Sequence, residues 1–399
     1  MHGVCGPAAR RKSLVSRATK GCGCAGAVLV LLLIPAGYIG WKYVLPWWKT
    51  KPPTPSGKEL QVHILDVGPV EGDSILIISP TGTSVLIDAG DTNKGKVVLE
   101  ALKRYNVQQL DFFIATHPHP DHIGGADEVI KGTKVLRVID NGTEPDVPES
   151  LAVKQNPKAV QKKSAQDKKP AEDKKKPAAR SNSITKFYDD YRDAVTQSGA
   201  SYEKVQAGTK YDIGGGAQLT VLAPTEPLFT RDQMKTGGNL PNANSIVIRL
   251  DYGDFSMLLT GDAEEQTEHR MLTKDVNLRS TILKVSHHGS KYATAQDFVD
   301  RVKPEVAVIS SGEWNRYGHP SQVVLDRLKA ANAKLFRTDL QGEITITTRG
   351  KDKDYVIKTA KEGAVDVWNG RTAQKDDSTR SGFIAYGDFG PPPKAVNRK

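Results

Sequence analysis

Cysteine is nearly absent from this sequence. The 399 residues contain three cysteines, Cys5, Cys22 and Cys24, and none lies beyond residue 24. The rest of the chain can therefore form no disulfides and cannot bind a metal through thiolates. Aromatic residues are also few, at 7% of the chain, whereas 38% of the residues are hydrophobic. The composition fits a mainly globular chain with one large or two ordinary domains, in which any metal site must use His and carboxylates.

Positive charge is not evenly spread. The formal charge is +10, but residues 1–20 carry five Lys/Arg and no acid, and residues 154–180 carry ten Lys/Arg against three acids. The remaining chain is close to neutral. This distribution argues against a folded surface that wraps duplex DNA, although a small basic cleft stays compatible with it.

Charged residues are missing from Gly21 to Trp41, a stretch long enough to cross a bilayer. The sequence predicts a single membrane anchor at 21–48, with tryptophans at its end. More Lys/Arg precede the apolar stretch than follow it, which predicts a cytoplasmic N-terminus and an extracytoplasmic body. The alternative is a cleaved signal peptide, which would release the body as a secreted protein.

Short β-branched runs separated by Gly, Pro and Asp alternate with amphipathic helical segments from residue 59 onward. This pattern predicts a mixed α/β sandwich of two sheets in one domain. The predicted parts are a basic cytoplasmic N-terminus (1–20), the transmembrane anchor (21–48), a Pro-rich spacer (49–58), the folded domain (59–357) with a disordered Lys-rich insertion (142–180), and a tail without a readable function (358–399).

The densest chemistry follows the apolar strand DFFIAT, where the chain reads HPHPDHIGG. Three imidazoles and a carboxylate lie within six residues, at His117, His119, Asp121 and His122. These are hard and borderline metal ligands held on a loop that two prolines stiffen. Three of the nine histidines have no packing reason to gather there. A metal site is the interpretation that accounts for them.

The THxHxDH run resembles the metallo-β-lactamase superfamily of metal-dependent hydrolases, and most closely the C-terminal hydrolase domain of the ComEC competence proteins. The segments that carry the resemblance extend from His63 to Ile346 in the family's order: HILDVGPVEGDS, LIDAG, ATHPHPDHIGG, NANSIVIRL, LLTGDAE, LKVSHHGSK, YGHPS and RTDLQGEI. The resemblance implies an αββα four-layer sandwich. It also implies a site for two divalent ions at the edge where the sheets meet, with zinc as the first expectation and manganese as the alternative.

The resemblance also assigns ligands. His117 and His119 would bind the first metal, Asp121 and His122 the second, and Asp262 would bridge both. His288 matches the last ligand of the second metal. His287 is the alternative, and the other of this pair would contact the substrate. Asp88 matches the aspartate that braces the His loop from behind.

Two departures from the family pattern bear on this assignment. The chain has no histidine between His122 and His269, so the first metal lacks the third His that the wider superfamily supplies. Asn244 or a water is the candidate to complete that shell. The chain also reads LDVGPVEGD where the family reads LDVGQGD, although the candidate site residues Asp66 and Asp73 keep their places.

His319 and Arg337 complete the candidate site. Arg337 could hold a phosphate oxygen with two hydrogen bonds, and His319 could bind the same group or protonate a leaving oxygen. The implied function is a membrane-anchored phosphodiesterase or nuclease that uses a hydroxide shared by the two metals, with DNA as a candidate substrate. The alternatives are a hydrolase of another ester, a phosphocholine or a lactone on the same fold, and a non-catalytic tethering protein.

Overall fold

The computed structural model describes residues 58–146, 185–234, 239–274, 276–314, 316–363 and 365–372. The anchor predicted at 21–48 and the insertion from residue 147 onward lie outside these residues. Among the helices that are described, none is both long enough and apolar enough to cross a bilayer.

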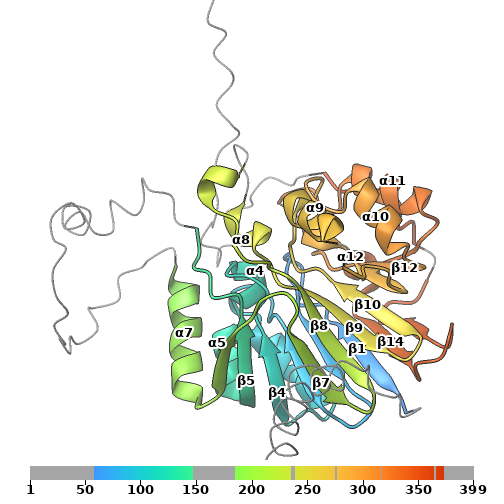
Figure 1. Cartoon of the computed structure of the whole chain (residues 1–399). Coiled ribbons are helices and arrows are strands. Elements are labelled where there is room, and N and C mark those ends of the chain that lie inside the picture. The colour runs from blue at the N-terminus through green and yellow to red at the C-terminus, as the bar shows by residue number, and fades with distance from the viewer. Residues whose placement is uncertain are drawn as a thin grey trace, which may run out of the picture. The chain divides into compact units, whose positions relative to one another are not determined.

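Two sheets form the centre of the described chain (Figure 1). The eight-stranded sheet has the order β15 (Val356–Thr359), β14 (Ile344–Thr348), β1 (Leu60–Ile64), β2 (Ile75–Ile78), β3 (Ser84–Ile87), β4 (Gln109–Ile114), β5 (Lys134–Asp140) and β6 (Ser201–Lys204). The seven-stranded sheet has the order β13 (Lys334–Arg337), β12 (Val306–Ile309), β11 (Ile282–Lys284), β10 (Phe255–Leu259), β9 (Val247–Tyr252), β8 (Ala217–Ala223) and β7 (Lys210–Gly214). Strands β3 to β6 and β10 to β13 run parallel, and the other pairings are antiparallel.

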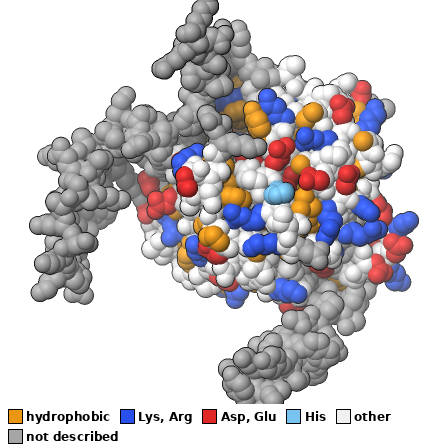
Figure 2. Space-filling model, turned by 45° about the horizontal axis from the view of Figure 1, so that its top comes forward, with side chains coloured by type: hydrophobic (Ala, Val, Ile, Leu, Met, Phe, Trp, Pro, Cys, Tyr) orange, Lys and Arg blue, Asp and Glu red, His pale blue; other side chains and the backbone are white. Residues whose placement is uncertain are grey.

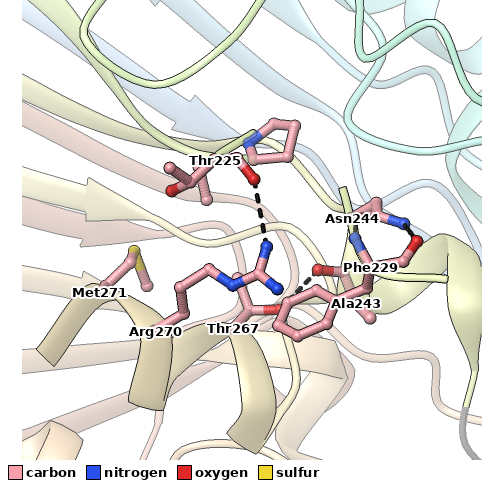
Figure 3. A pocket seen from close by; sticks show the side chains of 9 residues that line it. Thr225, Phe229, Ala243, Asn244, Thr267, Arg270 and Met271 are labelled. Carbon is pink, nitrogen blue, oxygen red and sulfur yellow. Dashed lines mark hydrogen bonds between the residues drawn. The ribbon is translucent and has the colours of Figure 1, made fainter. Parts of the chain in front are cut away.

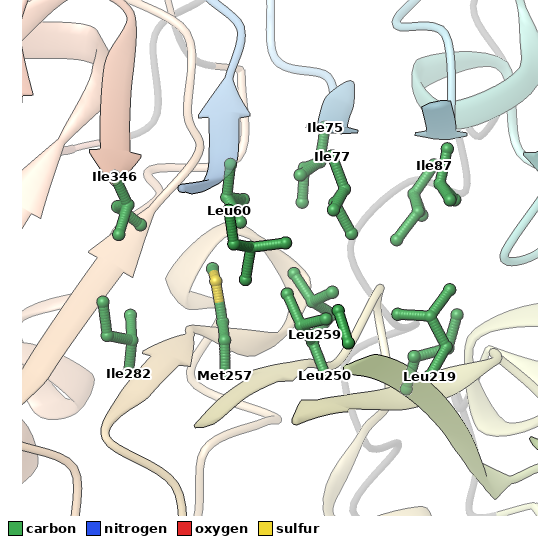
Figure 4. Close-up of a cluster of buried hydrophobic side chains, with 14 of the residues drawn as sticks. Leu60, Ile75, Ile77, Ile87, Leu219, Leu250, Met257, Leu259, Ile282 and Ile346 are labelled. Carbon is green, nitrogen blue, oxygen red and sulfur yellow. The ribbon is translucent and has the colours of Figure 1, made fainter. Parts of the chain in front are cut away.

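The sheets pack face to face through alternate apolar side chains (Figure 4). Leu60, Ile75 and Ile77 of the first sheet and Leu250 and Met257 of the second are each at most 3% exposed. Because neighbouring residues of a strand point to opposite faces, these residues turn one face of each sheet toward the other. Burial of a side chain of this size stabilises the fold by about 1.5–3 kcal/mol.

Helices cover the outer face of each sheet, as Figure 1 shows. The helices that pack on the first sheet are α3 (Gly95–Arg104), α5 (Ala126–Gly132) and α7 (Lys186–Ser198), and those on the second are α9 (Glu265–Thr273), α10 (Gln296–Val302) and α11 (Gln322–Ala330). Short helical turns lie in the connections between strands and longer helices: α4 (Pro120–Ile123), η3 (Arg231–Gln233), α8 (Leu240–Ala243), η4 (Ser286–Gly289) and α12 (Thr338–Gln341). The predicted two-sheet α/β sandwich is confirmed.

Part of the region predicted to be a tail without a readable function packs on the body. Trp368 lies against the apolar cluster beneath α10 and α11. The backbone carbonyls of Val367 and Asn369 accept hydrogen bonds from the Arg337 guanidinium, at 2.9 and 2.6 Å. The segment 365–372 therefore belongs to the fold, although it has no apolar period that sequence inspection could have detected.

The sandwich brings the candidate site together at the carboxyl ends of strands from both sheets. Asp88 follows β3 and the His-rich loop follows β4, while Asp262 and the His287-His288 pair follow β10 and β11. Parallel strands end at the same edge of a sheet, so residues far apart in sequence meet there.

Glu268 of α9 should make the stability of the fold depend on pH. Its side chain is completely buried and accepts backbone N–H groups of Thr294 (2.7 Å) and Ala295 (2.9 Å) at the start of α10. Burial raises the pKa of Glu268 from 4.5 to about 8. A carboxyl whose pKa is higher in the folded state contributes stability at low pH that is lost as the pH rises through about 8.

Glu268→Gln should therefore remove part of the pH dependence, because the amide stays neutral. Urea unfolding of the metal-free chain measures this effect at pH 5 and pH 8. Between these two pH values, the free energy of unfolding of the wild type should fall by about 2–4 kcal/mol more than that of the variant. Glu265→Gln, at an exposed position of the same helix, is the control. Equal pH dependence in wild type and Glu268→Gln would contradict the prediction.

Candidate metal centre

The His-rich loop folds back on itself directly after β4. His117 Nε2 lies 2.9 Å from His119 Nδ1, and the two rings meet edge to face. His117 is 1% exposed. Together with Asp262, these two histidines form one group whose candidate ligand atoms all lie within 4.8 Å of one another.

A second group of four lies beside the first. Asp121, His122, Asp262 and His288 offer ligand atoms within the same 4.8 Å limit. His288 Nε2 lies 3.4 Å from Asp121 Oδ2. Asp262 belongs to both groups, and it is the residue to which the resemblance assigns the bridging role.

The two carboxylate oxygens of Asp262 face different histidines. Oδ1 lies 3.2 Å from His122 Nε2 and 3.6 Å from His288 Nε2. Oδ2 lies 3.8 Å from His117 Nε2 and 3.7 Å from His287 Nε2. One side chain thus divides its charge between two clusters of imidazole nitrogens.

Three buried atoms in this arrangement have no hydrogen-bond partner: His122 Nε2, His288 Nε2 and Asp262 Oδ1. Buried polar atoms are normally hydrogen-bonded, because leaving one unpaired costs about 1–3 kcal/mol. Here the unpaired atoms converge, and each can offer a lone pair to a cation once the rings have lost their extra protons. His and carboxylate ligands of this kind suit divalent ions. The residues present therefore fit a metal ion.

The nitrogens on the other side of the rings are held by the protein. His122 Nδ1 donates to Asp88 Oδ2 at 2.7 Å, and His288 Nδ1 donates to the Ser310 carbonyl at 2.9 Å. Asp88 is itself oriented by Thr116, whose backbone N–H and hydroxyl donate to its two oxygens. Because each Nδ1 is engaged, Nε2 is the nitrogen that faces the cluster. Asp88 thus takes the bracing position that the sequence predicts.

Several of these residues have a backbone conformation that non-glycine residues rarely adopt. The φ angles are 59° for Asp88, 47° for His287 and 52° for His288. Such conformations cost of order 1–3 kcal/mol each and persist where the surrounding structure imposes them. Their occurrence on three residues around one cluster is typical of a functional site.

Charges within the cluster set the protonation of the metal-free protein. Burial opposes charge on His122 and His288, but Asp262 and the neighbouring carboxylates raise the pKa of both well above the usual value. Burial likewise opposes charge on Asp262, yet these histidines hold its pKa well below the usual value. Protons on the two rings thus balance the carboxylates, and a divalent ion would displace them on binding.

The other predicted site residues with a place beside the cluster are His287, His319 and Asp73. Burial lowers the pKa of His287 to about 4, so its ring is neutral. The His319 ring lies 5.3 Å from that of His287. Asp73 contacts His288 Nδ1 at 3.4 Å and forms a buried ion pair with Lys284 at 2.5 Å. Asp73 therefore supports a ligand rather than facing solvent.

The structure does not support the predicted phosphate contact of Arg337. Its side chain is 1% exposed, and Nε and Nη2 donate to the two oxygens of Asp339 at 3.0 and 2.7 Å. Nη1 donates to the two carbonyls of segment 365–372. The guanidinium fastens that segment to the body and is not available to a substrate.

The side-chain amide of Asn244, the candidate to complete the first metal shell, is hydrogen-bonded within its own loop (Figure 3). Its Oδ1 accepts the backbone N–H of Phe229 at 2.9 Å, and its Nδ2 donates to the carbonyl of the same residue at 3.1 Å. The amide closes a loop beside a small pocket that includes Arg270. The Asp66 carboxylate stabilises a local turn, because its Oδ1 accepts a hydrogen bond from the backbone N–H of Gly68 at 3.1 Å. Asp66 is not among the carboxylates of the two candidate metal groups.

Other residues around the cluster had no assignment from the sequence. Asn242 Nδ2 donates to Glu264 Oε1 at 3.2 Å and lies 3.3 Å from His287 Nδ1. Burial raises the pKa of Glu264 to about 7. A lysine inside the apolar strand TILKVS was the available signal for the buried ion pair of Lys284.

One face of the molecule shows a histidine side chain at the surface among acidic and basic side chains (Figure 2). Two tyrosines near the site are exposed as well: Tyr292, four residues after His288, is 61% exposed and Tyr317 is 51% exposed. The Tyr317 ring stacks on that of His319 at a centroid distance of 5.7 Å. An exposed aromatic ring thus lies directly against His319.

Comparison with known proteins agrees with this geometry. Residues 67–199 match the Metallo-beta-lactamase superfamily. ComE operon protein 3 of Bacillus subtilis is 30% identical over 303 residues, which are 72% of this chain and 33% of that protein. The described domain is a metallo-β-lactamase fold related to that of the ComEC proteins.

Two further relatives match a similar share of this chain at lower sequence identity. Recombination protein 2 of Haemophilus influenzae is 26% identical over 72% of this chain and 28% of its own length. Competence protein ComA of Neisseria gonorrhoeae is 26% identical over 79% of this chain and 37% of its own length. The chain spans about a third of the length of these curated relatives.

Proposed function

We propose that this chain is a metal-dependent phosphodiesterase, with nucleic acid as its substrate class. The observation that carries the proposal is the convergence of unpaired His122 Nε2, His288 Nε2 and Asp262 Oδ1, next to a second His pair that shares Asp262. Two divalent ions, zinc or manganese, would be held there. When bound, such ions activate water and polarise the phosphate oxygens.

The chain's own residues contribute orientation and charge. Asp88 and the Ser310 carbonyl fix the rings of His122 and His288, so that Nε2 of each points into the cluster. Asp262 supplies the negative charge between the two groups. His287 and His319 lie on the neighbouring side, where a substrate ester would be positioned.

Three features favour a phosphodiester over other esters. Lys291, three residues after His288, is exposed and lies over the Tyr292 ring at 5.1 Å, which provides a cation next to an aromatic face. Phosphates bind cations, and bases stack on aromatic rings. Two relatives are named for competence and recombination, which favours DNA as the polymer.

A substrate panel tests the proposal. The metal-loaded full-length chain should cleave bis(p-nitrophenyl) phosphate and single-stranded or double-stranded DNA faster than a carboxylic ester, a lactone or a phosphocholine ester. Preferential turnover of one of the last three would replace the phosphodiester assignment with that class. Metal binding without turnover of any substrate would favour a tethering role.

We also propose that the domain acts at a membrane, outside the cytoplasm. The apolar, uncharged stretch Gly21 to Trp41 and the excess of Lys/Arg before it support this placement. Protease treatment of intact cells should digest the domain while the chain sediments with membranes. Protection from protease until the cells are lysed would contradict the orientation.

The ligand counts predict the order of metal binding. The group Asp121, His122, Asp262 and His288 offers four protein ligands, and the group of His117, His119 and Asp262 offers three. The four-ligand group should therefore fill first when the metal-free chain is titrated calorimetrically.

Single variants assign the two binding events. His288→Ala should remove the tight event and His117→Ala the weak one, whereas His269→Ala, at an exposed position of α9, should change neither. Loss of the tight event in His117→Ala would reverse the order.

A further inference from the structure

The loop that is two residues longer than the family pattern packs on the loop after β12. A Cβ atom on Gly312 would lie 2.4 Å from the carbonyl carbon of Val70, so the two backbones touch with no room for a side chain. The Trp314 N–H donates to the Pro69 carbonyl at 2.7 Å. The longer loop is therefore held in place by the loop that follows β12.

This packing brings Glu71 to His319. Glu71 Oε1 lies 3.1 Å from His319 Nδ1, although 248 positions separate the two residues in sequence. Glu71 is 5% exposed and His319 is 9% exposed. A carboxylate and an imidazole this deeply buried interact with little competition from water.

His319 is held from its other side by the segment that carries the metal ligands. A Cβ atom on Gly289 would lie 2.6 Å from the Pro320 ring. The backbone N–H and the hydroxyl of Ser321 both donate to the Gly289 carbonyl, at 2.9 and 3.0 Å. His319 is therefore fixed between the longer loop and the turn that contains His287.

We propose that Glu71 is a positioning residue for His319: it accepts the Nδ1 hydrogen and orients the ring so that Nε2 serves the substrate. This inference rests on the proposed function. It gives a role to Glu71 of the LDVGPVEGD segment, which stands directly before Gly72-Asp73, where the family pattern LDVGQGD has Gln. The arrangement is that of a carboxylate and histidine pair, in which the carboxylate fixes the tautomer and the orientation of the ring.

Four variants of the full-length chain, assayed on bis(p-nitrophenyl) phosphate, separate positioning from a structural role. Glu71→Ala and His319→Ala should each lower kcat about 10–100-fold, with the smaller share of the effect in KM. Glu71→Gln should retain most of the activity, because its amide oxygen still accepts from Nδ1. Adding Glu71→Ala to His319→Ala should cause no further loss, since Glu71 acts through the ring.

Metal content should stay at the wild-type value in all four variants, and circular dichroism should show each variant fully folded at the assay temperature. Glu313→Ala, at an exposed position of the loop that packs on Glu71's loop, is the matched control and should behave as wild type. Multiplicative losses in the double variant, or equal losses in Glu71→Gln and Glu71→Ala, would overturn the proposal.

A second measurement does not depend on turnover. Nitrogen-15 spectra of histidine-labelled chain, assigned with His319→Ala, should show hydrogen on His319 Nδ1 in the wild type and in Glu71→Gln, and a changed signal in Glu71→Ala. If the wild type hydrolyses no phosphodiester, the proposed function fails, and these spectra still decide the positioning. A His319 ring with hydrogen on Nε2 alone, or one indifferent to Glu71→Ala, would overturn it.

Discussion

Replacing Asp262 with asparagine is expected to weaken both metal-binding events together and to reduce turnover of a phosphodiester below detection. The Asp262 carboxylate faces His122 and His288 through one oxygen and His117 and His287 through the other. The amide keeps the shape of the side chain but loses the charge that offsets two cations. Replacing a residue that only supports a metal ligand typically lowers metal affinity by about 10–100-fold. Because Asp262 would itself be a ligand, its replacement should lower metal affinity by more than about 100-fold.

Calorimetric titration of the metal-free variant, with circular dichroism to confirm the fold, measures this effect. Asp254→Asn is the control, because Asp254 is an exposed residue between β9 and β10. Loss of only one binding event would show that Asp262 does not bridge. Full activity of Asp262→Asn would remove the basis of the metal-dependent mechanism.

Arg337→Ala is expected to act on stability and not on the site. The variant removes four hydrogen bonds and leaves the buried Asp339 with Arg371 as its remaining ionic partner. Breaking a buried ion pair in this way should lower the free energy of unfolding by about 3 kcal/mol. Metal stoichiometry should not change.

Urea unfolding compared with metal analysis tests this expectation. Arg349→Ala is the matched control, because Arg349 pairs with Glu59 at the surface, where such a pair contributes about 0–1 kcal/mol. A stable Arg337→Ala variant with a raised KM for a phosphodiester would instead restore the role that the sequence suggested for Arg337.

The sequence was most informative where a local motif and a strand end coincide. The HPHPDH run follows the apolar strand DFFIAT, and a loop at the end of a buried strand has a predictable place at the sheet edge. Asp262 follows an apolar strand in the same way. The metal groups could therefore be assembled from residues at strand ends once the resemblance had set their order.

Residues whose partners lie far away in sequence could not be placed from the sequence. The role of Arg337 depends on carbonyls about 30 positions later, in a segment without an apolar period. Glu71 meets His319 only because two loops from different sheets pack together. The hydrogen bonds of the Asn244 amide to Phe229, 15 positions earlier, could not be read from its motif either.

Dependence of turnover on metal occupancy tests the central claim most directly. The metal-free full-length chain, titrated with Zn²⁺ or Mn²⁺ while hydrolysis of bis(p-nitrophenyl) phosphate is followed, should gain activity only as ions bind. That activity should reach its plateau at two ions per chain. Turnover that is independent of bound metal, or saturated binding of two ions without any phosphodiester hydrolysis, would contradict the account.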